Sequence, residues 1–182
     1  SVHNKISELE KSGILIRLKK GLYVVSPKKS GKLLSMELIA NHLYGPSYVS
    51  MESALRYYGL IPESVYITQS MTTKHSREFK NSLGKFEYTQ CTKEYFAIGI
   101  RHEIKDNAAF LIAQPEKALC DLIVNTPNLN MRFQKEILTY LEDNLRFDMD
   151  AFFKMDANIF QQCALVGKKK STITNIIKII KK

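Results

Sequence analysis

Hydrophobic residues near the start of the chain recur at helical intervals. Val2, Ile6 and Leu9 follow this spacing and Gly13 comes shortly afterwards, which predicts a short amphipathic helix that ends at the glycine. The opposite face of this helix is polar and is available for contact with a partner. It carries His3, Asn4, Lys5, Ser7 and Glu8.

Two runs of β-forming residues follow. Residues 14–18 and 22–25 are rich in Ile, Leu and Val, and the turn Lys19-Lys20-Gly21 separates them, which is typical of a β-hairpin. A polar-faced helix followed by a cationic hairpin matches the back half of a winged helix-turn-helix, whose wing meets DNA phosphates. The alternative is an ordinary helix-hairpin unit with a solvated turn.

The rest of the chain mixes helical and strand patterns. Strands are predicted at 65–68, 86–89, 96–100 and 110–113. Helices are predicted at 34–43, at 51–58 with Ser50 as N-cap, and from Gln114-Pro115-Glu116 onward. After Pro127 the chain is mostly helical, with three groups of apolar residues at helical spacing: Phe133, Ile137, Leu138 and Leu141, then Phe152, Phe153 and Met155, then Ile159, Phe160 and Leu165. We therefore expect an α+β protein: a partial winged helix-turn-helix at residues 1–32, followed at 33–182 by a larger mixed α/β domain with a helical C-terminal part.

The last segment, 168–182, is a basic amphipathic helix. Ile173, Ile176, Ile177 and Ile180 form one face and lysines the other. Such a helix can lie on a membrane, bind nucleic acid or dock its apolar face on protein. The segment is short for membrane anchoring, so we favour packing against the body of the chain or against a partner.

Charge is concentrated at the two ends of the chain. The net charge is +9, of which residues 1–33 and residues 168–182 each contribute +6, so the middle is acidic. Basic ends around an acidic body favour an anionic partner that the ends engage. The candidate DNA contacts are the polar side chains of the first helix, His3, Asn4, Lys5 and Ser7, and the cations of the hairpin and its flank, Arg17, Lys19, Lys20, Lys28 and Lys29.

Composition excludes several other classes of protein. The content of 45% hydrophobic and 25% charged residues is that of a globular chain, and no apolar run is long enough to cross a bilayer. No secretory signal precedes the helix, and the three cysteines form no metal-binding cluster. We expect a cytoplasmic protein with reduced thiols, no metal, no cofactor and no membrane partner.

Three further patterns have competing interpretations. Lys117 and Asp121, one helical turn apart, are interpreted as a surface ion pair rather than a catalytic pair. The dense tyrosines are assigned to aromatic packing rather than base stacking; they are Tyr44, Tyr48, Tyr57 and Tyr58. Glu78-Phe79-Lys80 has the Glu-x-Lys form of some metal-dependent nucleases, but only Glu63 is near enough in the sequence to supply a second acid.

Three longer segments resemble the AbiEi family of antitoxins and transcriptional regulators. The first is Tyr44-Gly45-Pro46-Ser47-Tyr48-Val49-Ser50-Met51-Glu52-Ser53-Ala54-Leu55 with its continuation Tyr58 to Glu63. The second consists of the separate motifs Thr72-Thr73-Lys74 and Gly84-Lys85-Phe86-Glu87-Tyr88. The third is Ile112-Ala113-Gln114-Pro115-Glu116-Lys117-Ala118-Leu119-Cys120-Asp121-Leu122. The resemblance covers residues 6–125, and the hairpin segment Gly13 to Tyr23 also looks like the DNA reader of the family.

The resemblance implies a function in type IV toxin–antitoxin systems, which were first described in phage abortive infection, a form of phage defence. A winged helix would bind operator repeats in double-stranded DNA and repress its own operon. The larger domain would counteract a nucleotidyltransferase-type toxin, by contact with the toxin or with its target. No catalytic residue is implied, so we expect a non-enzyme. The alternatives are a metal-dependent nuclease built on Glu78 and Lys80, and a protein-interaction module without DNA binding.

Overall fold

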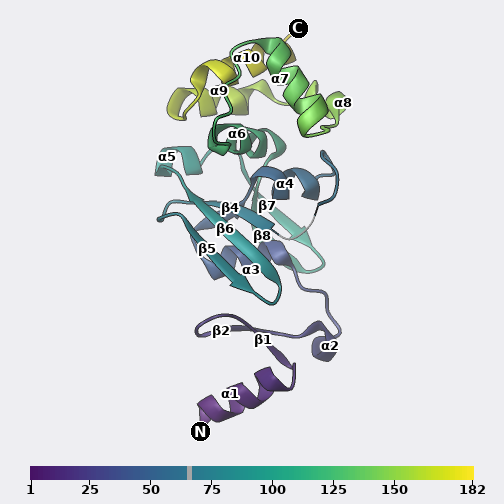
Figure 1. The fold of residues 1–182 in the computed structure, drawn as a ribbon, viewed down its shortest axis with the longest axis vertical. Helices are drawn as coiled ribbons and strands as arrows, with labels where there is room; N and C mark the ends of the chain where they lie inside the picture. The colour runs from purple at the N-terminus through teal and green to yellow at the C-terminus, as the bar shows by residue number, and fades with distance from the viewer. Residues whose placement is uncertain (65–66) are drawn as a thin grey trace.

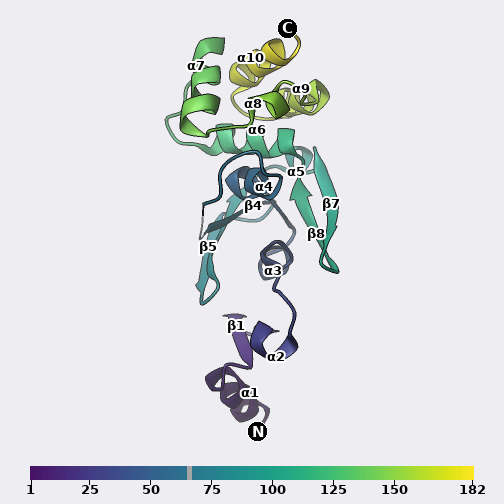
Figure 2. The same cartoon turned by 90° about the vertical axis from the view of Figure 1, so that its right-hand side faces the viewer.

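The structure is a computed structural model that describes residues 1–64 and 67–182, and it is an α+β fold as expected. A small N-terminal unit stands at one end of the long axis, a six-stranded sheet lies in the middle and a layer of short helices lies at the other end (Figure 1). The N-terminus and the C-terminus lie at opposite ends of the molecule, as both views show (Figure 2).

The N-terminal unit consists of α1 (Val2–Lys11) and a two-stranded antiparallel sheet of β1 (Leu15–Lys19) and β2 (Leu22–Val25). The Ser1 hydroxyl accepts a hydrogen bond from the Asn4 amide and caps α1, and Gly13 and Gly21 adopt the positive φ angles that their turns require. The helix and the hairpin are therefore confirmed. A short helix, α2 (Pro27–Ser30), follows and ends at Gly31, which has φ +68°.

The central sheet has the strand order β5-β6-β4-β3-β8-β7. Its strands are β3 (Ser47–Val49), β4 (Ile67–Thr72), β5 (Arg77–Asn81), β6 (Gly84–Gln90), β7 (Ile100–Lys105) and β8 (Ala108–Ala113). The short β3 lies at the centre, antiparallel to β4 and parallel to β8, to which it is paired at Val49 and Ile112. The two halves of the sheet are thus joined through a strand of three residues.

Helices cover both faces of this sheet. α3 (Met36–Leu43) lies on the face toward the N-terminal unit, and α4 (Met51–Tyr57) and α6 (Pro115–Asn125) lie on the other face (Figure 2). One turn of α3 is held by three partners. The Asn41 side chain exchanges two hydrogen bonds with the backbone of Leu111 on β8, at 3.2 and 2.7 Å, and the Tyr88 hydroxyl donates to the carbonyl of Ala40 at 2.6 Å. The third partner is Lys19 of the hairpin.

The C-terminal helices pack on α6. They are α7 (Gln134–Thr139), which continues as a π-helical turn over Tyr140–Asn144, then α8 (Met149–Phe152), α9 (Ala157–Val166) and α10 (Lys170–Ile180). Ile173, Ile176 and Ile179 of α10 are buried against α9 and α7. The apolar face of the basic tail therefore packs on the body of the chain, which confirms the favoured interpretation of that segment.

Several local predictions are wrong. Of the predicted strand 96–100, only Ile100 lies in a strand, at the start of β7. Phe96 ends α5 (Lys93–Phe96), a helical turn that begins because the Thr92 hydroxyl accepts the Tyr95 amide at 3.3 Å, and residues 97–99 form a turn. β3 and β5 were not predicted. Of the predicted strand 65–68, Val65 and Tyr66 lie outside the described residues, and β4 begins at Ile67. Three residues that were assigned to apolar stripes are exposed: Phe133, Phe153 and Leu165.

Candidate functional site

The first candidate site is the polar face of α1. His3, Asn4, Lys5 and Ser7 are all exposed, and no residue of α1 is buried. The helix contacts the rest of the molecule through β1 and lies at the end of the long axis (Figure 1). Its polar side chains are therefore accessible over their full length, as a helix that enters a DNA groove requires.

The hairpin presents its cations at the surface but is also fixed to the body. Arg17 and Lys20 are exposed, whereas Leu18 between them is buried at 4% exposure in the common hydrophobic core. The Asn81 side chain donates to the carbonyl of Leu18 at 3.2 Å. Only the apolar side of the hairpin is thus packed, and its cationic side remains open.

Lys19 differs from the other cations of the hairpin. Its ammonium group donates to the carbonyl of Leu43 at the end of α3, at 2.7 Å, and lies 5.7 Å from the centre of the Phe79 ring. Lys19 as a whole is exposed, but its ammonium group is bonded to the body. Lys28 and Lys29 are exposed on α2, beyond the hairpin.

The fold adds a cation from the body to this surface. A groove of about 520 Å³ runs between the hairpin and the turn that joins β5 to β6, and Arg17, Lys19, Lys20 and Lys80 all line it. Glu10 is the one acid in this lining. Sequence reasoning did not place Lys80 here, because sixty residues separate it from the hairpin and no local pattern links the two. Four cations around one groove make a surface suited to a polyanion.

The Glu-x-Lys pair does not form a metal site in the described part of the chain. β5 places Glu78 and Lys80 on one face, as expected, but both are exposed, and the Glu78 carboxylate pairs with the Lys85 ammonium at 3.1 Å. Within residues 1–64 and 67–182, no group of three His, Cys, Asp or Glu side chains could hold a metal ion. No observation therefore favours the nuclease alternative.

The interpretation of Lys117 and Asp121 as a surface ion pair is wrong. Both side chains have 0% exposure. The Lys117 ammonium donates to the carbonyls of Tyr95 and Ile98, at 2.5 and 2.7 Å, and lies 4.2 Å from the centre of the Tyr95 ring. The reason is that α6 is buried around most of its circumference, between the sheet and the C-terminal helices, so even its polar positions face the interior.

Asp121 is the acceptor at the centre of this buried cluster. Its Oδ2 atom accepts from the Tyr48 hydroxyl at 2.9 Å and from the Ser50 hydroxyl at 2.6 Å. Burial raises the pKa of Asp121, while the charge of Lys117 and these hydrogen bonds oppose the shift. Asp121 and Tyr95 lie close enough to affect each other's pKa, yet Asp121 Oδ1 and the Tyr95 hydroxyl both lack a partner at hydrogen-bond geometry among the described residues.

The bond from Ser50 explains the start of α4. Ser50 occupies the N-cap position, as predicted, but its hydroxyl bonds to Asp121 and makes no capping bond, and Met51 has a φ of +51°. The cluster thus joins β3, α4 and α6 at one point in the interior. Because no solvent reaches Ser50, Lys117 or Asp121, the cluster has no access for a substrate and serves to hold these elements together.

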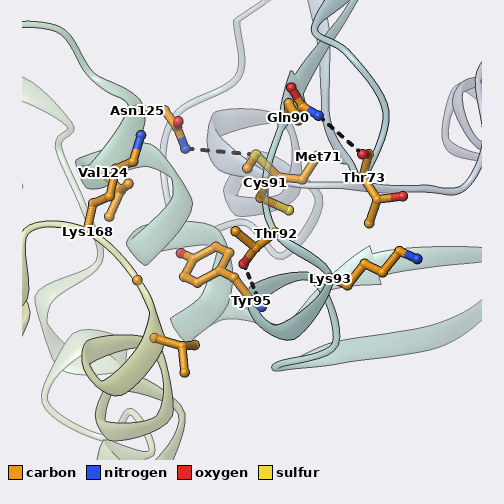
Figure 3. Close-up of a pocket in the computed structure, with 12 residues that line it drawn as sticks. Met71, Thr73, Gln90, Cys91, Thr92, Lys93, Tyr95, Val124, Asn125 and Lys168 are labelled. Carbon is orange, nitrogen blue, oxygen red and sulfur yellow. Dashed lines mark hydrogen bonds between the residues drawn. The ribbon is translucent and has the colours of Figure 1, made fainter.

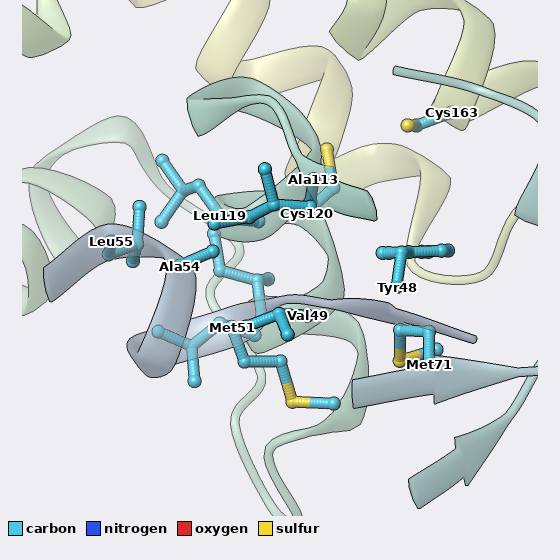
Figure 4. Close-up of a cluster of buried hydrophobic side chains, with 14 of the residues drawn as sticks. Tyr48, Val49, Met51, Ala54, Leu55, Met71, Ala113, Leu119, Cys120 and Cys163 are labelled. Atoms are coloured by element: carbon cyan, nitrogen blue, oxygen red, sulfur yellow. The ribbon is translucent and has the colours of Figure 1, made fainter. Parts of the chain in front are cut away.

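The tyrosines pack in the core, in agreement with the packing interpretation. The Tyr48 ring is fully buried and lies edge-on to Phe96, with the two ring centres 4.9 Å apart. Tyr57 and Tyr58 pack edge-on to each other at 5.3 Å, and Tyr44 lies 5.2 Å from Tyr88 in the same way. Figure 4 shows Tyr48 beside Val49 and Met71 in this core. The ring of Tyr48 is therefore unavailable to stack on bases, whereas Tyr44, Tyr57 and Tyr58 are half-buried and pack against the core.

Comparisons with known proteins add no identity. No protein-family model matches the chain, and no curated protein matches it either. Among the helices in the described part of the chain, none combines the length and the apolar character needed to cross a bilayer.

Proposed function

We propose that this chain is a non-enzymatic DNA-binding antitoxin that represses its own operon. The observation that supports DNA binding is the N-terminal unit, which projects from the body and exposes both a polar helix face and a cationic hairpin (Figure 1). In this proposal α1 enters the major groove, where Asn4 and Ser7 reach base edges. Arg17 and Lys20 contact phosphates on either side.

Lys80 extends the proposed contact onto the body of the protein. The groove that Lys80 shares with the hairpin is open to solvent and lined by four cations, so a phosphate backbone can follow it. Lys19 belongs to the same groove, but its hydrogen bond to Leu43 makes it mainly an attachment of the hairpin to α3. We therefore assign the main phosphate contacts to Arg17, Lys20 and Lys80.

The antitoxin part of the proposal rests on the resemblance to the AbiEi family. The resembling segments include residues 44–63 and 112–122, which contain β3, α4 and most of α6. These are the elements that the Tyr48, Ser50 and Asp121 cluster joins in the interior. We assign the neutralising activity to residues 33–182, against a nucleotidyltransferase-type toxin or its target.

DNA binding is tested by a salt series with the DNA upstream of the operon as probe. Each neutralised phosphate contributes about 0.9 to the slope of log affinity against log salt, so the double variant R17E/K20E should reduce the slope by about 2 and weaken all sequences alike. K80E alone should reduce it by about 1. The matched control is K154E, which reverses an exposed cation of the body far along the chain from the hairpin.

The proposal makes different predictions for its two parts. If R17E/K20E binds DNA like the parent and like K154E, the hairpin is not the reader and the repressor part is wrong. The antitoxin part is tested separately, by co-expression with a nucleotidyltransferase-type toxin. Growth should be restored by the parent and also by R17E/K20E. Loss of rescue with R17E/K20E would contradict the assignment of neutralisation to residues 33–182.

A further inference from the structure

A second site of a different kind lies on the opposite side of the molecule from the hairpin. A cavity of about 410 Å³ opens between the end of β6, α5, the C-terminal end of α6 and the link between α9 and α10 (Figure 3). This volume falls within the range of small-molecule sites. The cavity lies outside the proposed DNA surface, and the proposed function does not use it.

The lining of the cavity is cationic. Lys168 and Lys93 line it, and no acidic side chain does. Figure 3 places Lys168 beside Asn125 on one side and Lys93 on the other. Neither ammonium forms an ion pair within the described residues. The adjacent Lys169 is used differently, because its ammonium donates to the carbonyls of Ile123, Thr126 and Leu129 at the end of α6. Lys168 is thus left free for an anionic group.

Two side-chain amides on the walls offer acceptors of fixed orientation. The Asn125 amide nitrogen donates to the carbonyl of Asp121 at 2.8 Å, and the Gln90 amide nitrogen donates to the carbonyl of Thr73 at 3.4 Å. Because a carbonyl can only accept, each amide must keep its nitrogen on that side. In the described structure nothing donates to Asn125 Oδ1 or Gln90 Oε1, and both residues line the cavity.

The remaining surface of the cavity is apolar and closely packed. Met71, Val124 and Val166 contribute it. Gly167 packs against the Tyr95 ring so closely that a Cβ atom would lie 2.8 Å from the ring and 2.6 Å from the carbonyl oxygen of Cys163. An apolar wall can pack against the face of a planar ring. The two amide oxygens can accept hydrogen bonds from amino groups on the edge of such a ring.

We infer that this cavity binds a nucleoside phosphate with an amino-substituted base. The phosphate lies against Lys168. The base lies on the apolar wall of Val124 and Val166, and its amino group donates to Asn125 Oδ1 or Gln90 Oε1. The chemical class of this ligand follows from three features of the cavity. Its lining has cationic but no acidic side chains, it offers amide oxygens that accept no hydrogen bond within the described structure, and one wall is apolar.

The inference is tested by calorimetric titration of the full chain with AMP, purine riboside 5′-monophosphate, adenosine and inorganic phosphate. Purine riboside monophosphate has a hydrogen in place of the amino group of AMP and no N–H on that edge of its base. We therefore expect AMP to bind about tenfold more tightly, because the analogue cannot donate to the amide oxygens. Adenosine and phosphate alone should each bind more weakly than AMP by at least about tenfold, since each lacks half of the contacts.

Two variants connect binding to this cavity. K168Q should weaken AMP binding by about fivefold or more, whereas K170Q, which changes an exposed lysine outside the lining, should leave it unchanged. V166W should block the site, since Val166 is 43% exposed and a larger side chain there fills the cavity without entering the core. Absence of saturable AMP binding near about 1 mM, equal binding of AMP and purine riboside monophosphate, or unchanged binding in K168Q and V166W would each overturn the inference.

Discussion

The buried ammonium of Lys117 provides a direct test of the polar cluster. We consider Lys117→Met, which keeps most of the length of the side chain and removes its charge. In the wild-type chain the ammonium donates to the carbonyl of Tyr95 in α5, at 2.5 Å, and to the carbonyl of Ile98 after α5, at 2.7 Å. It is also the one cation that lowers the pKa of the buried Asp121. The variant therefore leaves two carbonyls and a carboxylate without this partner.

The size of the effect follows from these losses. An unsatisfied buried carbonyl costs about 1–3 kcal/mol, so two of them cost about 2–6 kcal/mol. Loss of the favourable effect of the Lys117 charge on the buried Asp121 carboxylate adds to this cost. Because the two losses concern the same ammonium, they overlap, and we expect the free energy of unfolding to fall by about 3–5 kcal/mol. For a chain of this length the melting temperature should fall by roughly 10 °C.

Urea unfolding followed by circular dichroism measures this loss, with Lys154→Met as the matched control at an exposed position. The control should change the free energy of unfolding by less than about 0.5 kcal/mol. The double variant K117M/D121N should lose less than the sum of the two single variants, because each single variant leaves the other group without its partner. A loss below about 1 kcal/mol for Lys117→Met would refute the structural role of the cluster.

Two further predictions concern titrating groups. Burial raises the pKa of Asp121, so the folded state holds the carboxyl proton more tightly than the unfolded chain does. The protonated carboxyl therefore contributes its full stabilisation of the folded state below the unfolded pKa of about 4, and this contribution is lost as the pH rises through the folded pKa. The free energy of unfolding of Asp121→Asn minus that of the wild type should therefore increase as the pH rises from about 4, and a difference that stays flat from pH 4 to pH 7 would contradict the buried carboxylate. Burial also raises the pKa of Cys91, to about 11. At pH 8 the thiolate fraction of Cys91 is roughly two hundred times smaller than that of a peptide thiol. A thiolate of higher pKa is more nucleophilic, which offsets about a factor of ten of this difference in rate. Exchange of Cys91 with an aromatic disulfide reagent should therefore be about twentyfold slower than exchange of a peptide thiol. The variant Cys91→Ser identifies the signal, and exchange at the rate of a free thiol would contradict the burial.

The secondary structure that the sequence predicted well is marked by strong local signals. The Gln114-Pro115-Glu116 start of α6 and the Gly13 end of α1 carry their own turn and capping chemistry, so they are visible without knowledge of the fold. β3 lacks such a signal. It is three residues long, begins directly after Pro46 and is defined by pairing with strands that come much later in the chain. Short central strands of this kind depend on tertiary contacts, which a local pattern does not contain.

The errors at Lys117 and Asp121 were avoidable. A spacing of four residues between opposite charges usually marks an exposed helix face. In α6, however, Ala118, Leu119, Cys120, Leu122 and Ile123 leave almost no polar face, and a helix that is apolar on all sides is buried. This apolar pattern, given more weight than the spacing of the two charges, predicts that Lys117 and Asp121 lie in the interior. The position of Lys80 beside the hairpin, in contrast, required the fold, because no sequence pattern links β5 to the N-terminal unit.

The hydrogen bonds around α3 determine how the N-terminal unit is oriented relative to the body. If residues 31–35 alone joined this unit to the body, it would be free to rotate. Instead, Lys19 is fixed to Leu43, one turn from Asn41 and Ala40, which are bonded to β8 and β6. The Asn81 side chain of β5 also donates to the carbonyl of Leu18, so rotation of the hairpin must break both bonds or displace α3 and β5. These bonds tie the orientation of the N-terminal unit to the sheet. Under the proposed function, the sheet therefore sets the direction in which α1 meets DNA.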